Sequence, residues 1–284
     1  LYGYGLVGVV IISTLFLRFV GKEYWMYLTV FWAVLPTAAS FLLTLCPLPC
    51  MDMQNNSVKT AENRHRTKEL LLCMLCIFLG ACAENTMSNW ISVYTETVIE
   101  IPKVWGDVLG MSLFAVLLAL TRTAYAKFGK NIFKTLMISM LGAAGCYFAV
   151  AASTNAALSL IFCVALGVCT SMLWPGPLIL MEEKIPAAGV AAYALMAAGG
   201  DFGASVAPQT LGIVVDNIAL TKWAENIGNA MSITPEQVGF KVGMLIAAVF
   251  PILGALLLVY MKKFFKIACF AMATVLLLAC LFAC

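Results

Sequence analysis

Apolar residues occur along this chain in runs of about 20, separated by short polar segments. A helix of about 20 residues spans the roughly 30 Å hydrocarbon core of a bilayer. Outer-membrane strands would instead alternate apolar and polar residues. The pattern therefore predicts an all-α membrane protein whose spans cover about 3–19, 25–46, 69–94, 105–121, 133–152, 156–181, 189–215 and 240–260. A further apolar run covers 264–284.

Three of these spans contain residues that weaken or reshape a helix. The Trp-Pro-Gly-Pro segment 174–177 predicts a kink or break, because proline removes a backbone donor and clashes with the preceding turn. The Gly-Gly-Asp-Phe-Gly segment 199–203 provides a small face for close helix contact. Pro251, close to Gly254, predicts a kink in the eighth span. Irregular backbone is tolerated in a bilayer only when it is buried in protein or lines a cavity.

Two carboxylates lie inside the apolar runs. Glu84 falls within the run 70–94 and Asp201 within the run 189–215. An acid near the centre of a bilayer costs about 2.5 kcal/mol or more unless it faces a partner or a water-filled cavity. The two acids therefore predict a path for a solute or for protons. The alternative is that each is a protonated or hydrogen-bonded packing element.

Further polar residues surround both acids. Glu84 and Ser88 are four residues apart and share a helix face, whereas Trp90 lies about 120° away and flanks it. Amide and hydroxyl groups beside an aromatic ring are the chemistry that a sugar requires, although Trp90 and Tyr94 could instead be interfacial anchors. The candidate substrate-binding or coupling residues are Glu84, Asn85, Ser88, Asn89, Trp90, Asp201 and Gln209.

Composition supports the membrane assignment and excludes several classes. The chain is 63% hydrophobic and 11% charged, with a mean hydropathy of +0.97. The net charge of +3, without a basic tract in a soluble segment, predicts no nucleic-acid partner. Most of the eleven cysteines lie within spans, and Cys73 and Cys76 lack a second cysteine pair, so we expect packing and no metal. We expect no cofactor and no enzyme, because no catalytic cluster or nucleotide-binding loop is present.

The connecting segments alternate in charge. Lysine and arginine are concentrated in 46–69, 122–134 and 262–266, whereas 96–107, 153–155 and 216–236 are acidic or uncharged. Basic loops face the cytoplasm, so we expect a multi-pass protein of the cell inner (cytoplasmic) membrane. Arg18 and Lys22 fall on the outer side, against this rule.

The polar segment 47–68 differs from the other connections and separates two spans from six. It contains the single histidine, His65, between two arginines, which we expect to be solvated. We divide the chain into two spans (1–46), a cytoplasmic linker (47–68), a six-helix half (69–260) and a basic-apolar tail (261–284). The tail could be an additional span, a segment resembling a secretory or lipoprotein signal, or an artefact of the gene end.

Several motifs are similar to those of one transporter superfamily. The span 105–121 carries Gly-Asp at 106–107 and Ser-Leu-Phe at 112–114, and a basic segment, 122–130, follows it. Together they resemble the cytoplasmic loop motif of the major facilitator superfamily, in its C-terminal-half copy. The span containing Glu84, the break at 172–176 and the helix at 198–201 are similar to fucose-permease-like sugar transporters. The resemblance covers about residues 1–260.

This resemblance implies an arrangement of two half-domains. Spans 1 and 2 would be the last helices of the N-terminal half, and about four helices would be missing in front of Leu1, where the chain begins inside an apolar run without an initiating Met. The site would lie near the bilayer midplane between the halves, with alternating access by rocking. The resemblance also implies a gating loop formed by Arg122, Lys127, Gly129 and Lys130.

We therefore expect a secondary active transporter, a proton-coupled symporter of a sugar or another small polar solute. Glu84 and Asp201 would be the coupling or binding acids, and Asn85, Asn89 and Trp90 would line the cavity. One alternative is an exporter of amphipathic compounds whose acids select cations, and a less favoured one is a multipass membrane enzyme. The expected partners are the solute, protons and the lipid bilayer, and we expect a monomer.

Overall fold

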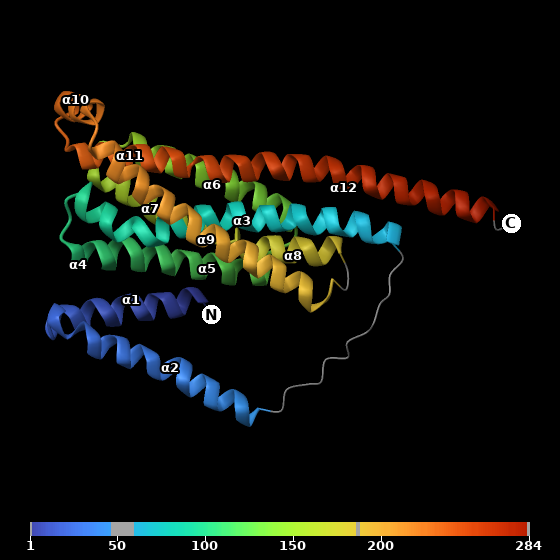
Figure 1. The fold of residues 1–284 in the computed structure, drawn as a ribbon, viewed down its shortest axis with the longest axis horizontal. Coiled ribbons are helices and arrows are strands. Elements are labelled where there is room, and N and C mark those ends of the chain that lie inside the picture. Colours follow the sequence, from blue (N-terminus) through green and yellow to red (C-terminus); the bar gives the residue numbers. More distant parts are fainter. Residues whose placement is uncertain (1, 47–59, 186–187, 283–284) are drawn as a thin grey trace.

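The computed structural model describes the backbone of residues 2–46, 60–185 and 188–282, and the side chains of 3–46, 67–185 and 188–265. This described part is helical, without a strand (Figure 1). Its helices are α1 (Tyr2–Phe19), η1 (Lys22–Tyr24), α2 (Trp25–Leu45), α3 (Thr60–Thr97), α4 (Lys103–Trp105), η2 (Gly106–Ser112), α5 (Leu113–Phe128), α6 (Ile132–Ala152), α7 (Ala156–Thr170), α8 (Pro175–Lys184), α9 (Gly189–Ala219), α10 (Lys222–Met231), α11 (Pro235–Ala247) and α12 (Val249–Phe282).

The predicted all-α membrane protein is confirmed. Over the described residues, seven helical segments are long and apolar enough to cross a membrane: Lys22–Leu45, Thr67–Thr97, Lys103–Phe128, Ile132–Ala152, Ala156–Lys184, Gly189–Ala219 and Pro235–Phe265. A shorter apolar helix, Gly3–Phe19, precedes them. Seven of the eight predicted spans thus coincide with these segments, and the first, 3–19, coincides with the shorter helix.

The helices that follow residue 60 pack around α3. This helix contacts α9 most extensively and also touches α7, α8, α11, α12 and η2. The first helix, α1, lies along α5 and η2, whereas α2 diverges from the bundle and leaves most of its apolar side chains exposed (Figure 1). The bundle is therefore organised by α3, the helix that carries Glu84.

The predicted small-residue face of α9 is confirmed. A Cβ atom at Gly203 would lie 2.4 Å from the backbone oxygen of Phe78 on α3. The Cys82 thiol of α3 donates to the Gly203 carbonyl over 3.5 Å. The close approach of α3 and α9 therefore depends on glycine at position 203.

The predicted break at 174–177 is confirmed, because α7 ends at Thr170 and α8 begins at Pro175. In the eighth span the discontinuity lies at Ala248, three residues before the predicted Pro251. Pro251 occupies the first turn of α12, where its missing N–H needs no helical partner. The sequence did not predict η2, a π-helix, which is a rare form often found at functional sites.

Three boundaries differ from the sequence prediction or extend it. The basic segment predicted as a loop over 122–130 is helical through Phe128, so the connection begins only at Gly129. Residues 60–68 of the predicted linker form the first turns of α3, while 47–59 and the side chain of His65 lie outside what is described. The tail continues α12 as helix through Phe282.

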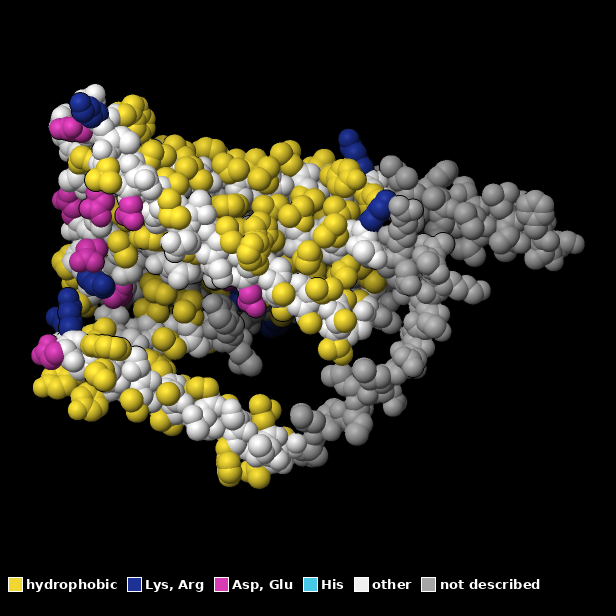
Figure 2. Space-filling model, viewed as in Figure 1, with side chains coloured by type: hydrophobic (Ala, Val, Ile, Leu, Met, Phe, Trp, Pro, Cys, Tyr) yellow, Lys and Arg dark blue, Asp and Glu magenta, His cyan; other side chains and the backbone are white. Residues whose placement is uncertain are grey.

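Charged side chains are concentrated at the two ends of the bundle. Acidic residues gather at the end that carries α10 (Figure 2); they include Glu23, Glu96, Glu100, Glu225 and Glu236. The connections α5–α6 and α8–α9 lie at the opposite end, together with the start of α3 (Figure 1). The lysines at this opposite end are Lys127, Lys130, Lys134, Lys184, Lys262 and Lys263. The predicted alternation of connection charges is thus present in the fold, and we name these surfaces the acidic end and the basic end.

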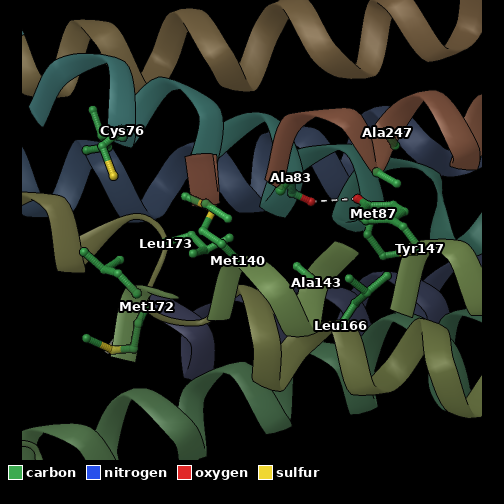
Figure 3. Packing of buried hydrophobic residues seen from close by; sticks show 14 of the residues in the cluster. Cys76, Ala83, Met87, Met140, Ala143, Tyr147, Leu166, Met172, Leu173 and Ala247 are labelled. Carbon is green, nitrogen blue, oxygen red and sulfur yellow. Dashed lines mark hydrogen bonds between the residues drawn. The ribbon is translucent and has the colours of Figure 1, made fainter. Parts of the chain in front are cut away.

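Apolar side chains fill the interior between α3, α6 and α7. Met87, Met140 and Leu166 are among those drawn in Figure 3, where the Tyr147 hydroxyl donates to the Ala83 carbonyl over 2.7 Å. Tyr94 is also fully buried, and its hydroxyl lies 2.8 Å from Ser159 Oγ. The interpretation of Tyr94 as an interfacial anchor is therefore wrong.

We predict that Gly203→Ala destabilises the protein by about 1–3 kcal/mol, because the new Cβ would be forced against the α3 backbone. Gly145→Ala in α6 is the matched control, since a Cβ there meets nothing within 4 Å. That control should be neutral or stabilising by up to about 1 kcal/mol, because alanine favours helix. Thermal unfolding in detergent measures both, and equal effects would contradict the packing argument.

Candidate functional site

A cavity of about 380 Å³ opens within the bundle at the depth of the α7–α8 break. Its walls come from α3, α5, the break and α9. The lining residues are Glu84, Asn85, Arg122, Trp174, Asp201 and Ala204. Glu84 lies near the middle of the span Thr67–Thr97, and Asp201 lies near the middle of Gly189–Ala219. The cavity is therefore placed where a membrane chain avoids charge unless it is partnered.

Glu84 forms an ion pair with Arg122. Both carboxylate oxygens accept from Arg122 Nη2, Oε1 over 2.8 Å and Oε2 over 2.9 Å. The Glu84 side chain is 6% exposed and that of Arg122 is 21% exposed. Burying either charge alone costs several kcal/mol, so each side chain makes the other tolerable at this depth.

The broken helix supplies a second partner for the guanidinium. Arg122 Nε donates to the Ser171 carbonyl over 2.6 Å. Ser171 follows the last residue of α7, where carbonyls lack helical partners and the helix dipole is negative. The break also lies tightly against α3, since a Cβ at Gly80 would come within 2.5 Å of the Leu173 oxygen. Arg122 thus joins α3 to the α7–α8 break.

Asp201 and Trp174 form the other side of the cavity. Asp201 is exposed, and its backbone carbonyl accepts from Ser205 Oγ one turn further along α9. The Trp174 ring lies against Gly200, where a Cβ would meet the ring at 2.9 Å. Glycine at 200 therefore leaves space for the indole beside the two acids.

The structure brings together only part of the predicted site. Glu84, Asn85 and Asp201 all line the cavity. Ser88 and Asn89 instead donate to the Asn85 carbonyl of their own helix, and Asn89 is exposed. Gln209 is exposed on α9, two turns beyond Asp201, and does not line the cavity.

Trp90 also lies away from the cavity. Its indole Nε1 donates to the Pro208 carbonyl over 3.0 Å, and its ring meets Phe240 edge-on at 5.8 Å between centroids. This tryptophan therefore joins α3, α9 and α11. The face of α3 that lines the cavity thus contains Glu84 and Asn85. Ser88, Asn89 and Trp90 of the next turn donate to backbone carbonyls instead.

The four residues predicted as a gating loop are separated in the structure. Arg122 lies in α5 and faces the cavity, whereas Lys127, Gly129 and Lys130 lie at the basic end. Lys127 Nζ lies 5.4 Å from the centroid of the Phe128 ring. Gly129 has no room for a Cβ, which would meet the Tyr125 carbonyl at 2.5 Å. Arg122 thus belongs to the cavity rather than to the connection.

Trp174 and the pairing role of Arg122 were not recognised from the sequence. Three signals pointed to them. A mid-span acid requires a cation, and Arg122 is the first basic residue after the neighbouring apolar run. A helix break must also expose polar backbone beside the residues that flank it. Read together, these signals place an arginine beside the break.

Among the described residues, no group of three or more histidine, cysteine or acidic side chains could hold a metal ion. Cys73 and Cys76 are buried free thiols within the core, as predicted.

Comparison of the chain with protein-family models, curated proteins and solved structures finds no match. The chemistry of the site thus rests on its own lining residues. These are the acid Glu84 paired with Arg122, a second acid, Asp201, the amide of Asn85 and the ring of Trp174.

We predict that Arg122→Met and Glu84→Gln are coupled in stability. Arg122→Met leaves the Glu84 carboxylate buried without its cation, which should cost about 3–5 kcal/mol. The double variant Glu84→Gln/Arg122→Met should be clearly more stable than the sum of the single effects predicts, because neither charge remains. Thermal unfolding of the four proteins in detergent gives the coupling free energy, and strict additivity would show that the pair contributes nothing.

Proposed function

We propose that the protein is a secondary active transporter, a proton-coupled symporter of a sugar or another small polar solute. The observation that carries this proposal is the Glu84–Arg122 pair, which lines a mid-membrane cavity together with Asp201. Ionisable groups at this depth mark solute and proton paths in membrane proteins. A purely structural pair would have no need of an adjoining cavity that holds a second acid.

The pair also provides a means of coupling. Protonation of Glu84 removes the negative charge that holds Arg122 Nη2, while the Ser171 carbonyl continues to hold Nε. The guanidinium can then donate to an oxygen of the solute in the cavity. Return of the carboxylate to its ionised form restores the pair and displaces the solute. Proton and solute binding are linked in this way through one side chain.

The cavity wall suits a hydroxylated solute. The Trp174 ring offers an apolar plate, and Asn85, Arg122 and Asp201 offer donors and acceptors around it. A small number of placed polar groups beside an aromatic surface is typical of small-molecule sites. A sugar presents both apolar ring faces and hydroxyl groups, which match this wall.

We further propose the arrangement of the major facilitator superfamily, with the described helices forming a C-terminal half and two helices of an N-terminal half. In support, α1 lies against α5 and η2. Thr14 of α1 and Ser92 of α3 both donate to the Asp107 carboxylate of η2. The Thr14–Asp107 bond would join the halves at the acidic end and would break during alternating access, whereas the Ser92–Asp107 bond lies within the C-terminal half.

The alternative cargo is an amphipathic cation moved outwards. Asp201 favours this candidate, because among the described residues it forms no ion pair and is exposed. An unpaired acid beside the Trp174 ring could bind an ammonium group by charge and cation–π attraction. The charge of the bound solute distinguishes the two candidates.

We predict that Glu84→Gln and Asp201→Asn each reduce proton-driven uptake by about tenfold or more, within the usual 1–3 kcal/mol of a coupling free energy. Asp216→Asn, a matched change nearer the end of α9, should leave uptake unchanged. Uptake into proteoliposomes with an imposed pH gradient is the measurement. Normal transport by both variants from about pH 5.5 to about pH 8 would show that the two acids serve packing and not coupling.

We also predict that Trp174→Ala weakens solute binding by at least tenfold, or about 1.4 kcal/mol, because the aromatic wall of the cavity is lost. Trp223→Ala, on exposed α10, is the control and should have no effect. Binding of labelled hexoses and of lipophilic cations to the purified protein is the measurement. Loss of hexose binding supports the symporter, whereas selective binding of lipophilic cations supports the exporter.

A further inference from the structure

A second and larger hollow lies at the basic end, outside the proposed solute site. Its volume is about 930 Å³, and it is formed by the start of α6, the end of α8 and the part of α12 that passes them (Figure 1). The residues that line it are Lys130, Asn131, Ile132, Phe133, Lys134, Met137, Leu180, Glu183, Lys184, Val259, Lys262 and Phe265. We refer to this hollow as the basic groove.

The rim of the groove carries a local excess of positive charge. Lys130, Lys134, Lys184 and Lys262 are all exposed and line it, against the single acid Glu183. Among the described residues, none of the four ammonium groups forms an ion pair. Lys184 lies over the Phe265 ring at 5.3 Å from its centroid, which holds this charge at the groove wall. Four cations, three from the helices α6, α8 and α12 and one from the α5–α6 connection, form an attractive site for an anion.

The groove becomes apolar towards the membrane interior. Phe133 and Met137 lie one turn apart in α6, and Val259 lies on α12, on the bilayer side of Lys262. Val259 is 47% exposed and therefore presents its side chain to whatever fills the groove. The wall thus changes from cationic to hydrocarbon along the direction in which a phospholipid lies.

We propose that the basic groove binds an anionic phospholipid, with its phosphate among the lysines and its acyl chains against Phe133, Met137 and Val259. Basic pockets between membrane helices on the cytoplasmic side are suited to anionic headgroups. A soluble phosphate would use the lysines but leave the apolar wall unfilled. The gradient from charge to hydrocarbon therefore selects a lipid, and the volume is at the upper end of small-molecule sites.

Binding of phosphatidylglycerol to the purified protein in detergent, measured by native mass spectrometry, tests this proposal. The variant Lys134→Gln/Lys262→Gln removes two of the four groove lysines. We expect it to bind phosphatidylglycerol about 30-fold more weakly, which is the loss of about 1 kcal/mol per lysine. The matched control Lys127→Gln/Lys263→Gln removes two lysines of the same end that do not line the groove, and should bind as the unmodified protein does.

A second pair of variants tests the apolar wall. Val259→Asn places a polar amide in the groove, whereas Val249→Asn is its control on the same helix, at 46% exposure and outside the groove. Only Val259→Asn should weaken phosphatidylglycerol binding. The proposal is overturned if the two lysine pairs have equal effects, if phosphatidylcholine of the same chain length binds equally well, or if glycerol phosphate binds as tightly as the lipid.

Discussion

The ion pair between Glu84 and Arg122 is the interaction on which the centre of the bundle depends. In a medium of low dielectric, neither charge is tolerated alone, and the attraction compensates for lost hydration only when the geometry is good. Here one guanidinium nitrogen contacts both carboxylate oxygens, and a second donates to the Ser171 carbonyl. Three separate chain segments must therefore meet at one point: the middle of α3, the last turns of α5 and the break between α7 and α8. Any rearrangement that opens the centre must provide a substitute for these contacts.

That meeting requires helices that approach closely, which explains the small residues around the site. Gly80 of α3 lies against the Leu173 carbonyl of the break, and Gly203 of α9 lies against the Phe78 carbonyl of α3. At Gly200 the Trp174 ring occupies the space that a side chain would need. In lipid there is no hydrophobic drive between apolar helices, so van der Waals contact and hydrogen bonds hold them together. The glycines thus position the walls of the cavity as well as the bundle.

The sequence was sufficient for the spans and for the break, because apolar run length and proline act locally. It also indicated two of the residues that line the cavity, Glu84 and Asp201, because acids within apolar runs are conspicuous. It failed where geometry across helices decides: Asn89 and Trp90 are near Glu84 in the chain, yet they bond to the Asn85 and Pro208 carbonyls instead of facing the cavity. The π-helical turn at Gly106–Ser112 and the burial of Tyr94 likewise follow from neighbours that are distant in sequence.

Arg122 was assigned to a loop from the sequence but lies within α5, and this difference shows that the surroundings a basic side chain requires depend on its depth in the bundle. Arg122 and Lys127 are only five residues apart and read as one basic segment, but α5 continues through Phe128. Arg122 is therefore carried more than a turn into the bundle, where it must be paired, whereas Lys127 remains at the end, where water and lipid headgroups can solvate it. A planar guanidinium suits the first position, because it can bind a carboxylate and a carbonyl at the same time. A lysine ammonium suits the second, because it is a flexible point charge at a hydrated surface. The choice between arginine and lysine along α5 thus follows the boundary between the protein interior and the membrane surface.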